Sequence, residues 1–528
     1  MKNLLKNLSV LFFLILASTQ LHAEGLDEKI NAAFTPVSDF FQNIIFFTIF
    51  GIPFVVILLV VGATFFTLYF GFINIRRFGT AINVVRGKYD DLDDHPQLEK
   101  SNVNVLDGDI VDTIKDESQE GEVSHFQALA TAVSGTVGLG NIAGVALAVA
   151  LGGPGATFWM IVCGLLGMST KFVECTLGVK YRDIGPDGTV YGGPMYYLTK
   201  GFEERNMGGV GKVLAVIFAI LCIGGSFGGG NMAQSNQAAS QLASLIGMQG
   251  GASGFIIGII LAVLVGLVII GGIKRIASVT EKVVPAMAVI YVLACLYIIV
   301  INFSYIDDAF GLIFSQAFSM EAGIGGLFGV LIVGFQRAAF SNEAGAGSAS
   351  IAHAAVRTKY PASEGLVALL EPFIDTVVIC TMTALVIIMY NSTGVFEYGA
   401  GEVIINGAQV EGATLTSMAF GSAISWFPYV LTIAIFLFAV STMISWSYYG
   451  SQAWMYLFGK SKAADITYKI IFCLFIVIGA SSSMEAVWGF SDAMILGLVF
   501  PNMIGLFFLF PRVKEELNKY IAVISKKS

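Results

Sequence analysis

The residues best suited to binding a ligand lie in one octet, Ser134 to Asn141, inside a long apolar stretch of the chain. The octet contains three glycines, and each glycine destabilises a helix interior by about 0.5–1 kcal/mol relative to alanine. Its two hydroxyls and one amide also compete for backbone hydrogen bonds. In a bilayer, backbone groups released from a helix are tolerated only where protein buries them or where they line a cavity. The octet therefore predicts an unwound stretch that forms a binding site.

The same pattern returns later in the chain, in the octet Ser341 to Ser348. Both octets read Ser-x-x-x-Gly-x-Gly and end in Asn or Ser. The first lies in a segment predicted to run from inside to outside, and the second lies five segments later in the opposite direction. Two interrupted segments at corresponding positions of opposed halves are the sequence pattern of an inverted-repeat transporter.

A broken helix can bind both an anion and a small cation. The N–H groups of Gly138 to Asn141, a range that includes Gly140, begin the outer half of the helix and suit a carboxylate. The carbonyls of Ser134 and Val137, together with Thr136, offer hard oxygen ligands that suit Na⁺.

A later segment presents the hydroxyls of Ser441, Thr442 and Ser445 at i, i+1 and i+4. These hydroxyls can complete a Na⁺ site. They can equally bond back to carbonyls of their own helix, as membrane serines and threonines often do.

Amides and aromatic rings add candidates for binding a substrate. Asn231, Gln234 and Gln237 are spaced at i, i+3 and i+6, so we expect them near one helical face. Such a face suits recognition of an amine or a carboxylate, but it also suits contacts between helices worth about 0.6–2 kcal/mol each. Phe340 and Trp446 are the aromatic residues nearest the predicted site, and large rings there leave room only for a small substrate.

Charged residues inside a membrane segment are functional candidates by default. Lys171 and Glu174 are three residues apart and can pair on one helical face, as a structural ion pair or as a gate. Glu343 lies in the second octet and is favoured as a coupling residue. Glu371 and Asp375 lie four residues apart and can either hold the broken helix by hydrogen bonds or relay a proton.

The remaining reactive side chains are expected to be structural. His353 lies near a predicted helix end. The cysteines are scattered without the spacing of a disulfide framework or a metal site, and we expect them to be buried packing residues. They are Cys163, Cys175, Cys222, Cys295, Cys380 and Cys473.

The composition describes the elements that must position these residues. Hydrophobic residues make up 56% of the 528 residues and charged residues 12%, with a mean hydropathy of +0.78. Soluble proteins carry about 25% charged residues. The sequence therefore predicts an all-α polytopic membrane protein, and no basic patch indicates nucleic acid.

The N-terminus is expected to enter the secretory route. Residues 1–23 resemble a signal peptide, with basic Lys2 and Lys6 before a short apolar region and Ala23 at its end. The alternative is an uncleaved extra helix. Residues 24–43 are predicted to be a polar extracytoplasmic lead-in.

Eleven spanning segments follow, each needing about 20 residues. The first is predicted over 44–74, and an acidic cytoplasmic loop over 75–124 follows it, as a solvated linker or, less favoured, a binding segment for a partner. The other ten are predicted at 125–150, 155–179, 212–243, 253–272, 280–302, 322–355, 364–390, 420–458, 465–484 and 488–511.

Lysine and arginine mark every second loop, and the intervening loops contain neither. Because cytoplasmic loops collect these residues, the mature N-terminus is predicted outside and the C-terminus inside. The organisation that follows is a first five-helix repeat over 125–302, a second over 322–511 and a cytoplasmic tail over 512–528.

Several long motifs resemble the alanine/glycine:cation symporter (sodium:alanine symporter) family. They are Phe126–Leu129, Gly135–Gly144, Gly152–Gly155 with Phe158–Met160, Tyr191–Pro194, Phe340–Gly345 and Glu371–Thr376. One position differs, because the family commonly has threonine where this chain has Leu139.

The resemblance implies a leucine-transporter-type 5+5 inverted repeat with one extra N-terminal helix, which takes up small amino acids with Na⁺ across the inner membrane. It implies Na⁺ ligands at Ser134, Val137, Ser441 and Thr442. It implies amino-acid contacts at Thr136, Gly138, Gln234, Phe340 and Trp446.

The combined prediction is an alternating-access symporter that performs no covalent chemistry. Na⁺ would organise the unwound stretches, and alanine or glycine would then bind at the midplane. Proton coupling through Glu343 or Asp375 is the alternative. A channel or a transporter-like sensor is less favoured, because a channel needs no pair of broken helices around a small site.

Overall fold

The computed structural model describes residues 26–92, 121–186, 188–248, 252–319, 326–399, 403–405, 407–410 and 412–526. The predicted signal peptide and most of the predicted acidic loop lie outside these described residues. Helices dominate the described part, which also contains three two-stranded antiparallel sheets.

The elements divide at the two predicted breaks. Before the first break lie α2 (Leu26–Ile45), β1 (Thr48–Ile49), β2 (Ile52–Pro53), α3 (Phe54–Tyr69), α4 (Ile73–Arg76), α5 (Phe78–Val85) and the 3₁₀ turn η1 (Asp90–Leu92). The first half then contains α6 (His125–Thr136), the π-helical turn η3 (Gly140–Gly144), α7 (Val145–Gly152), α8 (Gly155–Lys180), β3 (Asp183–Ile184), β4 (Val190–Tyr191), α9 (Pro194–Glu203), α10 (Gly208–Phe227), the π-helical turn η4 (Gly228–Met232), α11 (Ala233–Ile246), α12 (Ser253–Ile269), α13 (Gly272–Ile301), the 3₁₀ turn η5 (Phe303–Tyr305) and α14 (Ile306–Ala317).

The second half begins at the other broken helix. It contains α15 (Gly326–Asn342), α16 (Ser350–His353), α17 (Pro361–Ala368), α18 (Leu370–Pro372), the π-helical turn η6 (Phe373–Cys380), α19 (Thr381–Tyr390), the 3₁₀ turn η7 (Asn391–Thr393), β5 (Ile404–Ile405), β6 (Ala408–Gln409), α20 (Gly412–Ala423), α21 (Phe427–Phe458), α22 (Lys462–Ser481), α23 (Met484–Gly497) and α24 (Val499–Ile524).

The structure changes the predicted N-terminal boundaries. The segment predicted as a polar lead-in forms α2, which packs on α23 through Phe34 against Phe490 (5.3 Å between ring centroids) and through Ser38 Oγ, which donates to the carbonyl of Ala486 (2.8 Å). The first apolar helix begins at Phe54, ten residues later than predicted, because the hairpin β1–β2 occupies the residues before it.

The predicted spans are present as helices, but eleven full-length spans are not confirmed. Seven described helices are long and apolar enough to cross a membrane, and an eighth is obtained if α6 and the helix over 140–152, bent by 50°, count as one. The helices α3 and α12 are apolar but shorter. Segments predicted as loops also contain structure. On one side, α14 lies within 303–321, β5 and β6 lie within 391–419, and α20 begins there. On the other side, α5, β3, β4 and α9 lie in the predicted cytoplasmic loops.

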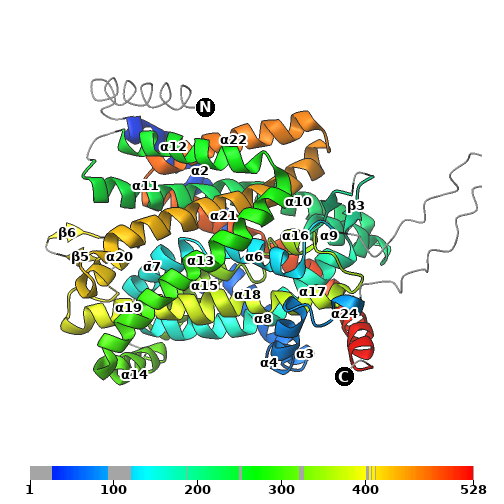
Figure 1. Ribbon diagram of the computed structural model, residues 1–528, viewed down its shortest axis with the longest axis horizontal. Helices are drawn as coiled ribbons and strands as arrows, with labels where there is room; N and C mark the ends of the chain where they lie inside the picture. The colour runs from blue at the N-terminus through cyan, green and yellow to red at the C-terminus, as the bar shows by residue number, and fades with distance from the viewer. Residues whose placement is uncertain are drawn as a thin grey trace, which may run out of the picture.

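Segments at corresponding positions of the two halves contact one another. The helix α6 packs on α16 and α7 packs on α15, so the two broken helices lie antiparallel. In the same order, α8 packs on α17, α10 on α21 and α12 on α22 (Figure 1). This pairing brings both breaks to the middle of the molecule.

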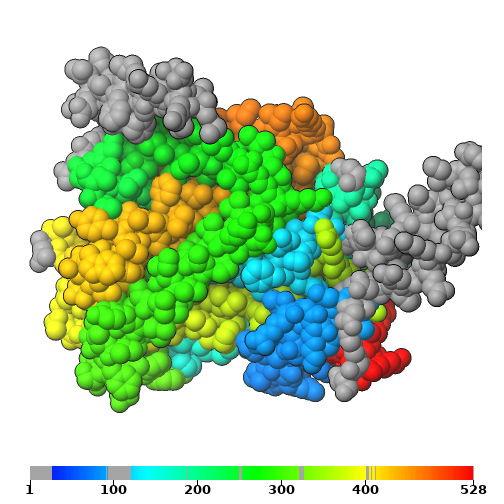
Figure 2. Space-filling view, in the orientation of Figure 1, coloured from blue at the N-terminus to red at the C-terminus, as the bar shows by residue number. Residues whose placement is uncertain are grey.

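The outer surface is apolar over long helices. Figure 2 shows α13 (green) crossing one face of the molecule diagonally. Val289, Leu293 and Val300 on α13 are exposed, as are Val263 and Leu267 on α12. Exposed large apolar side chains on helices of spanning length are expected to face lipid.

Candidate functional site

The first break lies between α6 and η3. Ser124 caps α6 in a capping box with Gln127, and the helix ends at Thr136. The Asn141 side-chain carbonyl then accepts the N–H of Gly138 (2.8 Å), and Gln234 Oε1 accepts the N–H of Leu139 (3.0 Å). Two of the N–H groups predicted to face a carboxylate are therefore bound by protein side chains in this conformation.

The second break follows α15. Glu343 adopts φ +55°, and Gly345 adopts φ +97°, where a side chain would be strained. The turn is held from two other helices: Glu174 Oε1 on α8 accepts the N–H of Gly345 (2.8 Å), and Asn502 Nδ2 on α24 donates to its carbonyl (2.8 Å). The second octet is thus unwound as predicted, and buried side chains satisfy its released backbone groups.

Asp375, on η6, joins the two breaks. Its Oδ1 accepts a hydrogen bond from Asn141 Nδ2 (2.6 Å), and its Oδ2 accepts from Ser341 Oγ (2.8 Å) and from Thr376 Oγ1 (2.6 Å). Asp375, Asn141 and Ser341 are all buried. Of the two roles predicted for Asp375, the geometry supports holding the broken helices by hydrogen bonds.

Glu371 does not join this bridge, although it was expected to share a face with Asp375. It binds Lys171 Nζ through Oε1 (3.1 Å), with both side chains fully buried. Glu371 lies on α18 and Asp375 in the π-helical turn η6 that follows it, which changes the angular spacing, so the two carboxylates reach different partners. The predicted pair of Lys171 with Glu174 is also wrong, because Glu174 turns to the second break.

Trp446 connects α21 to both breaks. Its Nε1 donates to the carbonyl of Gly135 (3.2 Å) and to Glu343 Oε1 (2.9 Å). The indole ring lies directly against Gly230 of η4, where an added Cβ would come within 2.2 Å of Trp446 Cγ. Glu343 and Trp446, which were predicted separately as site residues, are therefore brought together, and Ser348 Oγ also binds Glu343.

This close approach predicts a strong effect of Gly230→Ala. The new methyl must displace Trp446, so we expect a loss of about 1–3 kcal/mol in stability and a matching loss of transport. Thermal melting of the detergent-purified protein and uptake assays measure both. Gly209→Ala on α10, where an added Cβ meets nothing within 4 Å, is the matched control. Equal behaviour of the two variants would contradict this packing.

The predicted Na⁺ ligands come together between α6 and α21. Ser134 Oγ donates to the carbonyl of Ser441 (2.9 Å), and Thr442 Oγ1 donates to the carbonyl of Ser134 (2.9 Å). Val137 is buried at the end of α6 beside them. Ser441 Oγ bonds back to Phe438 in its own helix (3.0 Å), so its carbonyl is the group that faces Ser134.

Two buried hydroxyls on the same stretch of α21 have no hydrogen-bond partner among the described residues. They are Ser445 Oγ and Tyr449 OH. Tyr449 lies beside Gly135, and its ring contacts that of Trp446 (5.2 Å between centroids). Buried polar atoms are almost always paired in folded proteins, so these two hydroxyls are candidates for binding a polar ligand. Tyr449 was missed from the sequence, where its type and spacing carry no signal.

The other predicted contacts differ in what they do. Thr136 Oγ1 bonds back to Ala132 (3.3 Å), and Gly138 lies against Thr442 and Gln234. The aromatic ring of Phe340 lies against Gly140.

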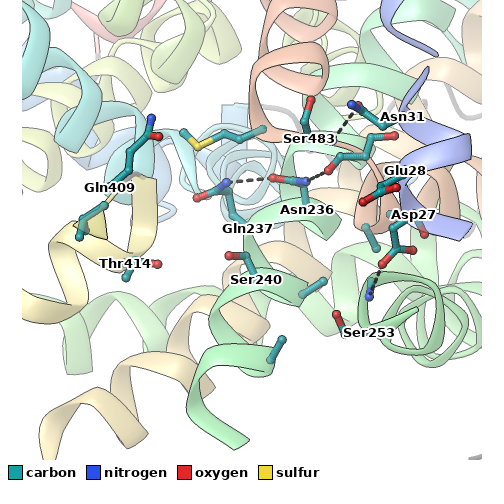
Figure 3. A pocket seen from close by; sticks show the side chains of 18 residues that line it. Asp27, Glu28, Asn31, Asn236, Gln237, Ser240, Ser253, Gln409, Thr414 and Ser483 are labelled. Carbon is teal, nitrogen blue, oxygen red and sulfur yellow. Dashed lines mark hydrogen bonds between the residues drawn. The ribbon is translucent and has the colours of Figure 1, made fainter. Parts of the chain in front are cut away.

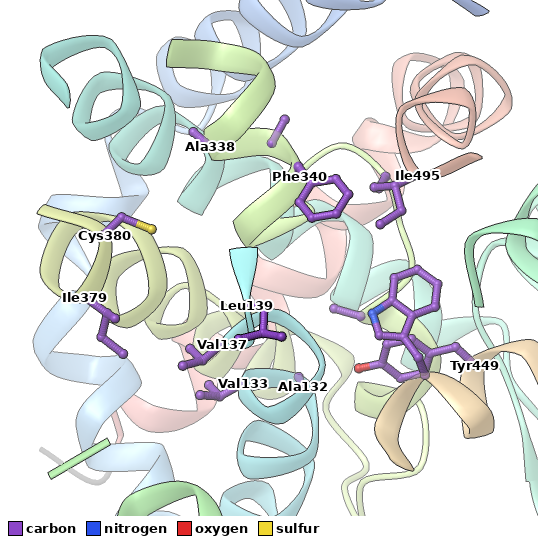
Figure 4. Packing of buried hydrophobic residues seen from close by; sticks show 14 of the residues in the cluster. Ala132, Val133, Val137, Leu139, Ala338, Phe340, Ile379, Cys380, Tyr449 and Ile495 are labelled. Carbon is purple, nitrogen blue, oxygen red and sulfur yellow. The ribbon is translucent and has the colours of Figure 1, made fainter. Parts of the chain in front are cut away.

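An apolar layer surrounds the breaks. Figure 4 shows Val133, Val137 and Leu139 along the first break, with Phe340 and Tyr449 on other elements around it. Leu139 is fully buried. A leucine at this position therefore replaces polar surface with packing beside the site.

An ion pair missed from the sequence lies above Phe340. Arg337 on α15 binds Asp492 on α23. The guanidinium also lies 5.6 Å from the ring centre of Phe340 and 5.5 Å from that of Trp488. Asp492 is a charge within an apolar segment, and that rule could have identified it.

The three amides expected on one face point to three places. Asn231 donates to the carbonyl of Phe472 on α22 (2.7 Å). Gln234 accepts the N–H of Leu139 at the first break, and Gln237 Oε1 accepts the N–H of Ala413 (3.1 Å). The π-helical turn η4 interrupts the helix at Asn231 and changes the spacing.

Gln237 also lines a cavity of about 610 Å³ away from the breaks. Figure 3 shows Gln237 joined to Asn236 on one side of this cavity, with Asp27 and Asn31 of α2 on another. The cavity is polar, and its lining includes none of the predicted Na⁺ ligands. The six cysteines are all free, and Cys380 Sγ lies 3.3 Å from Asn141 Nδ2.

The chain is similar to known proteins over most of its length. The model of the Sodium:alanine symporter family matches residues 36–528. The chain is 40% identical to the sodium/alanine symporter AgcS of Methanococcus maripaludis over 89% of this chain and 94% of that protein. It is 36% identical to the putative sodium/proton-dependent alanine carrier protein YrbD of Bacillus subtilis, over 78% of this chain and 84% of that protein.

Among solved structures, MhsT in complex with L-phenylalanine matches 75% of this chain and 99% of its own, with a TM-score of 0.47 and 15% identity. The named sequence relatives are transporters, in agreement with the expectation that the chain is not an enzyme. The length and identity of the sequence matches make the assignment plain: the chain belongs to the sodium:alanine symporter family.

Proposed function

We propose that this protein takes up a small neutral amino acid such as alanine or glycine together with Na⁺, by alternating access. The observation that carries the proposal is the bridge made by Asp375, which binds Asn141 at one break and Ser341 at the other. A pair of unwound helices joined in this way can enclose a small site and change its exposure when the halves move.

The Na⁺ site is proposed between α6 and α21. Two pairs of oxygens already lie 2.9 Å apart there. One pair is Ser134 Oγ with the carbonyl of Ser441, and the other is Thr442 Oγ1 with the carbonyl of Ser134. Val137 supplies a further carbonyl at the end of α6. Na⁺ binding would replace the Thr442 to Ser134 hydrogen bond with two bonds to the ion, which favours oxygen ligands of this kind.

The amino acid is proposed to bind beside it, between the first break and α21. Trp446 and Phe340 limit the space, and Gly138 brings the backbone close to Thr442. The unpaired hydroxyls of Ser445 and Tyr449 provide hydrogen-bonding groups. A buried site with this little room favours a small side chain over a large one.

The proposed architecture is a leucine-transporter-type 5+5 inverted repeat, formed by residues 125–302 and 322–511. It is supported by the ordered contacts of corresponding helices, in which α8, α10 and α12 pack on α17, α21 and α22. The helix α3 is the proposed extra N-terminal helix. Rocking of one half against the other would then expose the site on each side in turn.

The orientation in the inner membrane, with the mature N-terminus outside, remains a proposal from loop charge. Ion pairs of Lys180 with Glu516 (2.7 Å) and of Arg512 with Glu204 (3.3 Å) join segments that are all predicted to be cytoplasmic, which supports placing these segments on one common side.

Proton coupling is a second candidate. Glu343 is buried, lies in the second break and binds Trp446, so a change in its protonation would alter a contact at the site. The relative YrbD is named a putative sodium/proton-dependent alanine carrier protein, which also favours this candidate.

The test is uptake of labelled alanine into reconstituted vesicles with either a Na⁺ gradient or a proton gradient imposed alone. Na⁺-coupled symport predicts accumulation with the Na⁺ gradient only. Accumulation with the proton gradient only would support the Glu343 candidate. Uptake that ignores both gradients would contradict symport.

A further inference from the structure

Two histidines bind the two oxygens of one buried carboxylate. The chain contains four histidines, and His125 and His353 are the two in the described part. His353 Nδ1 lies 2.5 Å from Glu364 Oε1, and His125 Nδ1 contacts Glu364 Oε2. His353 was expected to be merely structural, and neither His125 nor Glu364 was singled out from the sequence.

This cluster runs from the edge of the protein into its interior. The side chains of Glu364 and His353 are fully buried, while that of His125 is 10% exposed. On the inner side, His353 Nε2 lies 3.6 Å from Glu371 Oε2, and Glu371 binds Lys171. His353 Nε2 has no hydrogen-bond partner among the described residues.

The three residues come from both proposed repeats, which are proposed to rock against each other. His125 is the first residue of α6, the inner half of the first broken helix. His353 is the last residue of α16, the inner half of the second. Glu364 lies on α17 between them, so one carboxylate joins both inner halves.

The charge of this cluster must depend on bound protons. A buried carboxylate without a nearby cation is costly, so an ionised Glu364 requires at least one imidazolium. The second imidazole can be neutral and still donate its Nδ1–H, or it can bind another proton. Histidine is the side chain whose ordinary titration falls between about pH 5 and 8.

We propose that His125, Glu364 and His353 form a proton-binding site that locks α6 to α16 and α17, so that proton loss loosens the lock. The proposal rests on the proposed function for its location, which places this lock on the cytoplasmic side. A second imidazolium strengthens the contact to Glu364 because its positive charge adds Coulomb attraction to the hydrogen bond that a neutral imidazole already makes.

The other carboxylates around this cluster bind partners outside it, so Glu364 is the carboxylate that the two histidines share. On α8, Lys171 pairs with Glu371, Glu174 holds the second break and Cys175 is a buried thiol. Towards the tail, Glu516 on α24 pairs with Lys180 and Lys519. Next to α6, Glu281 on α13 accepts from Gln127, Glu122 accepts from the N–H of Val190, and Asp375 and Tyr449 lie at the breaks.

The test is hydrogen exchange of the α6 peptide, residues 125–136, in the purified full-length protein at pH 6 and pH 9. Rates are corrected for the intrinsic pH dependence of exchange, and residues 256–268 of α12 serve as the internal reference. We expect protection of α6 to fall about tenfold at the higher pH, the effect of weakening one contact between an imidazolium and a carboxylate to that of a neutral imidazole.

Glu364→Gln removes the carboxylate while keeping the side-chain shape. We expect α6 in this variant to be weakly protected at both pH values. His125→Gln, at the outer end of the cluster, is the second variant and is used if Glu364→Gln does not fold. We expect it to reduce the pH response of α6. Glu281→Gln, which removes a carboxylate contact to α6 outside the lock, is the matched control and should respond like the wild type.

Protection of wild-type α6 that does not change with pH would overturn the proposal. So would a wild-type pH response in Glu364→Gln or, where that variant does not fold, in His125→Gln. The hydrogen-exchange measurement needs no transport. A failure of Na⁺-driven uptake would therefore contradict the proposed function without contradicting the proton-binding lock.

Discussion

Asp375→Ala is expected to abolish Na⁺-driven alanine uptake. The substitution removes the carboxylate that accepts from Asn141 Nδ2 at one break and from Ser341 Oγ at the other, and both donors stay buried. Only longer contacts remain, from Asn141 Nδ2 to the carbonyl of Asp375 (3.2 Å) and from both donors to Cys380 Sγ (3.3 and 3.4 Å). Each lost hydrogen bond to a buried carboxylate costs about 1–3 kcal/mol. Because about 1.4 kcal/mol corresponds to a factor of ten, two lost contacts reduce the competent population by roughly 30-fold or more.

The role of Asp375 as a bridge can be separated from a role in proton transfer. Asp375→Asn keeps one acceptor oxygen and cannot ionise, so we expect it to retain part of the uptake, with the same Na⁺ dependence. Asp465→Asn on α22, which removes only a partly exposed pair with Lys469, is the matched control and should transport normally. Full activity of Asp375→Ala in vesicles would show that the breaks do not depend on this bridge.

Thr442→Ala is expected to weaken Na⁺ activation more than amino-acid selectivity. Thr442 Oγ1 lies 2.9 Å from the carbonyl of Ser134, where the ion is proposed to bind. Loss of one oxygen ligand costs about 1–3 kcal/mol, so the Na⁺ concentration for half-maximal uptake should rise roughly 5- to 150-fold. The ratio of alanine to glycine uptake should stay the same.

The matched control for this variant is Ser447→Ala on the same helix. Ser447 Oγ is buried and bonds back to the carbonyl of Ile444 in its own helix, away from the proposed ion site. Its Na⁺ dependence should match the wild type. If Thr442→Ala keeps the wild-type Na⁺ affinity, Thr442 is not an ion ligand.

The positions of both breaks could be predicted from the sequence because the signal is local. Glycines, hydroxyls and amides weaken a helix wherever they occur, and a bilayer makes that weakness costly without a function. The recurrence of the octet at Ser341 to Ser348 required only a comparison of residue types. The hydroxyls of Ser441 and Thr442 followed from their spacing on one apolar segment.

The partners of the charged residues could not be predicted in the same way. The expected pair of Lys171 with Glu174, and the expected common face of Glu371 and Asp375, each assumed one regular α-helix. The π-helical turn η6 changes the spacing before Asp375, and tertiary packing brings Glu371 to Lys171 from another helix.

Contacts across long stretches of chain leave no local pattern either. Asn502 holds Gly345 from α24, and Ser38 binds Ala486 to seat α2 on α23. Each depends on which helices pack together, and that information lies in the whole fold. The hairpin β1–β2 was likewise not predicted. Its six residues before Phe54 belong to the apolar segment, so the start of α3 was predicted too early.

The coupling of Na⁺ transport to alanine transport is tested most directly by measuring Na⁺ movement driven by an alanine gradient. Vesicles with the same Na⁺ concentration on both sides receive labelled Na⁺ and an inward alanine gradient, with the membrane potential clamped at zero. Na⁺-coupled symport predicts net Na⁺ accumulation against its own gradient, lost in Thr442→Ala at low Na⁺ and kept in Ser447→Ala. Alanine entry without net Na⁺ movement, or with acidification of the lumen instead, would contradict it.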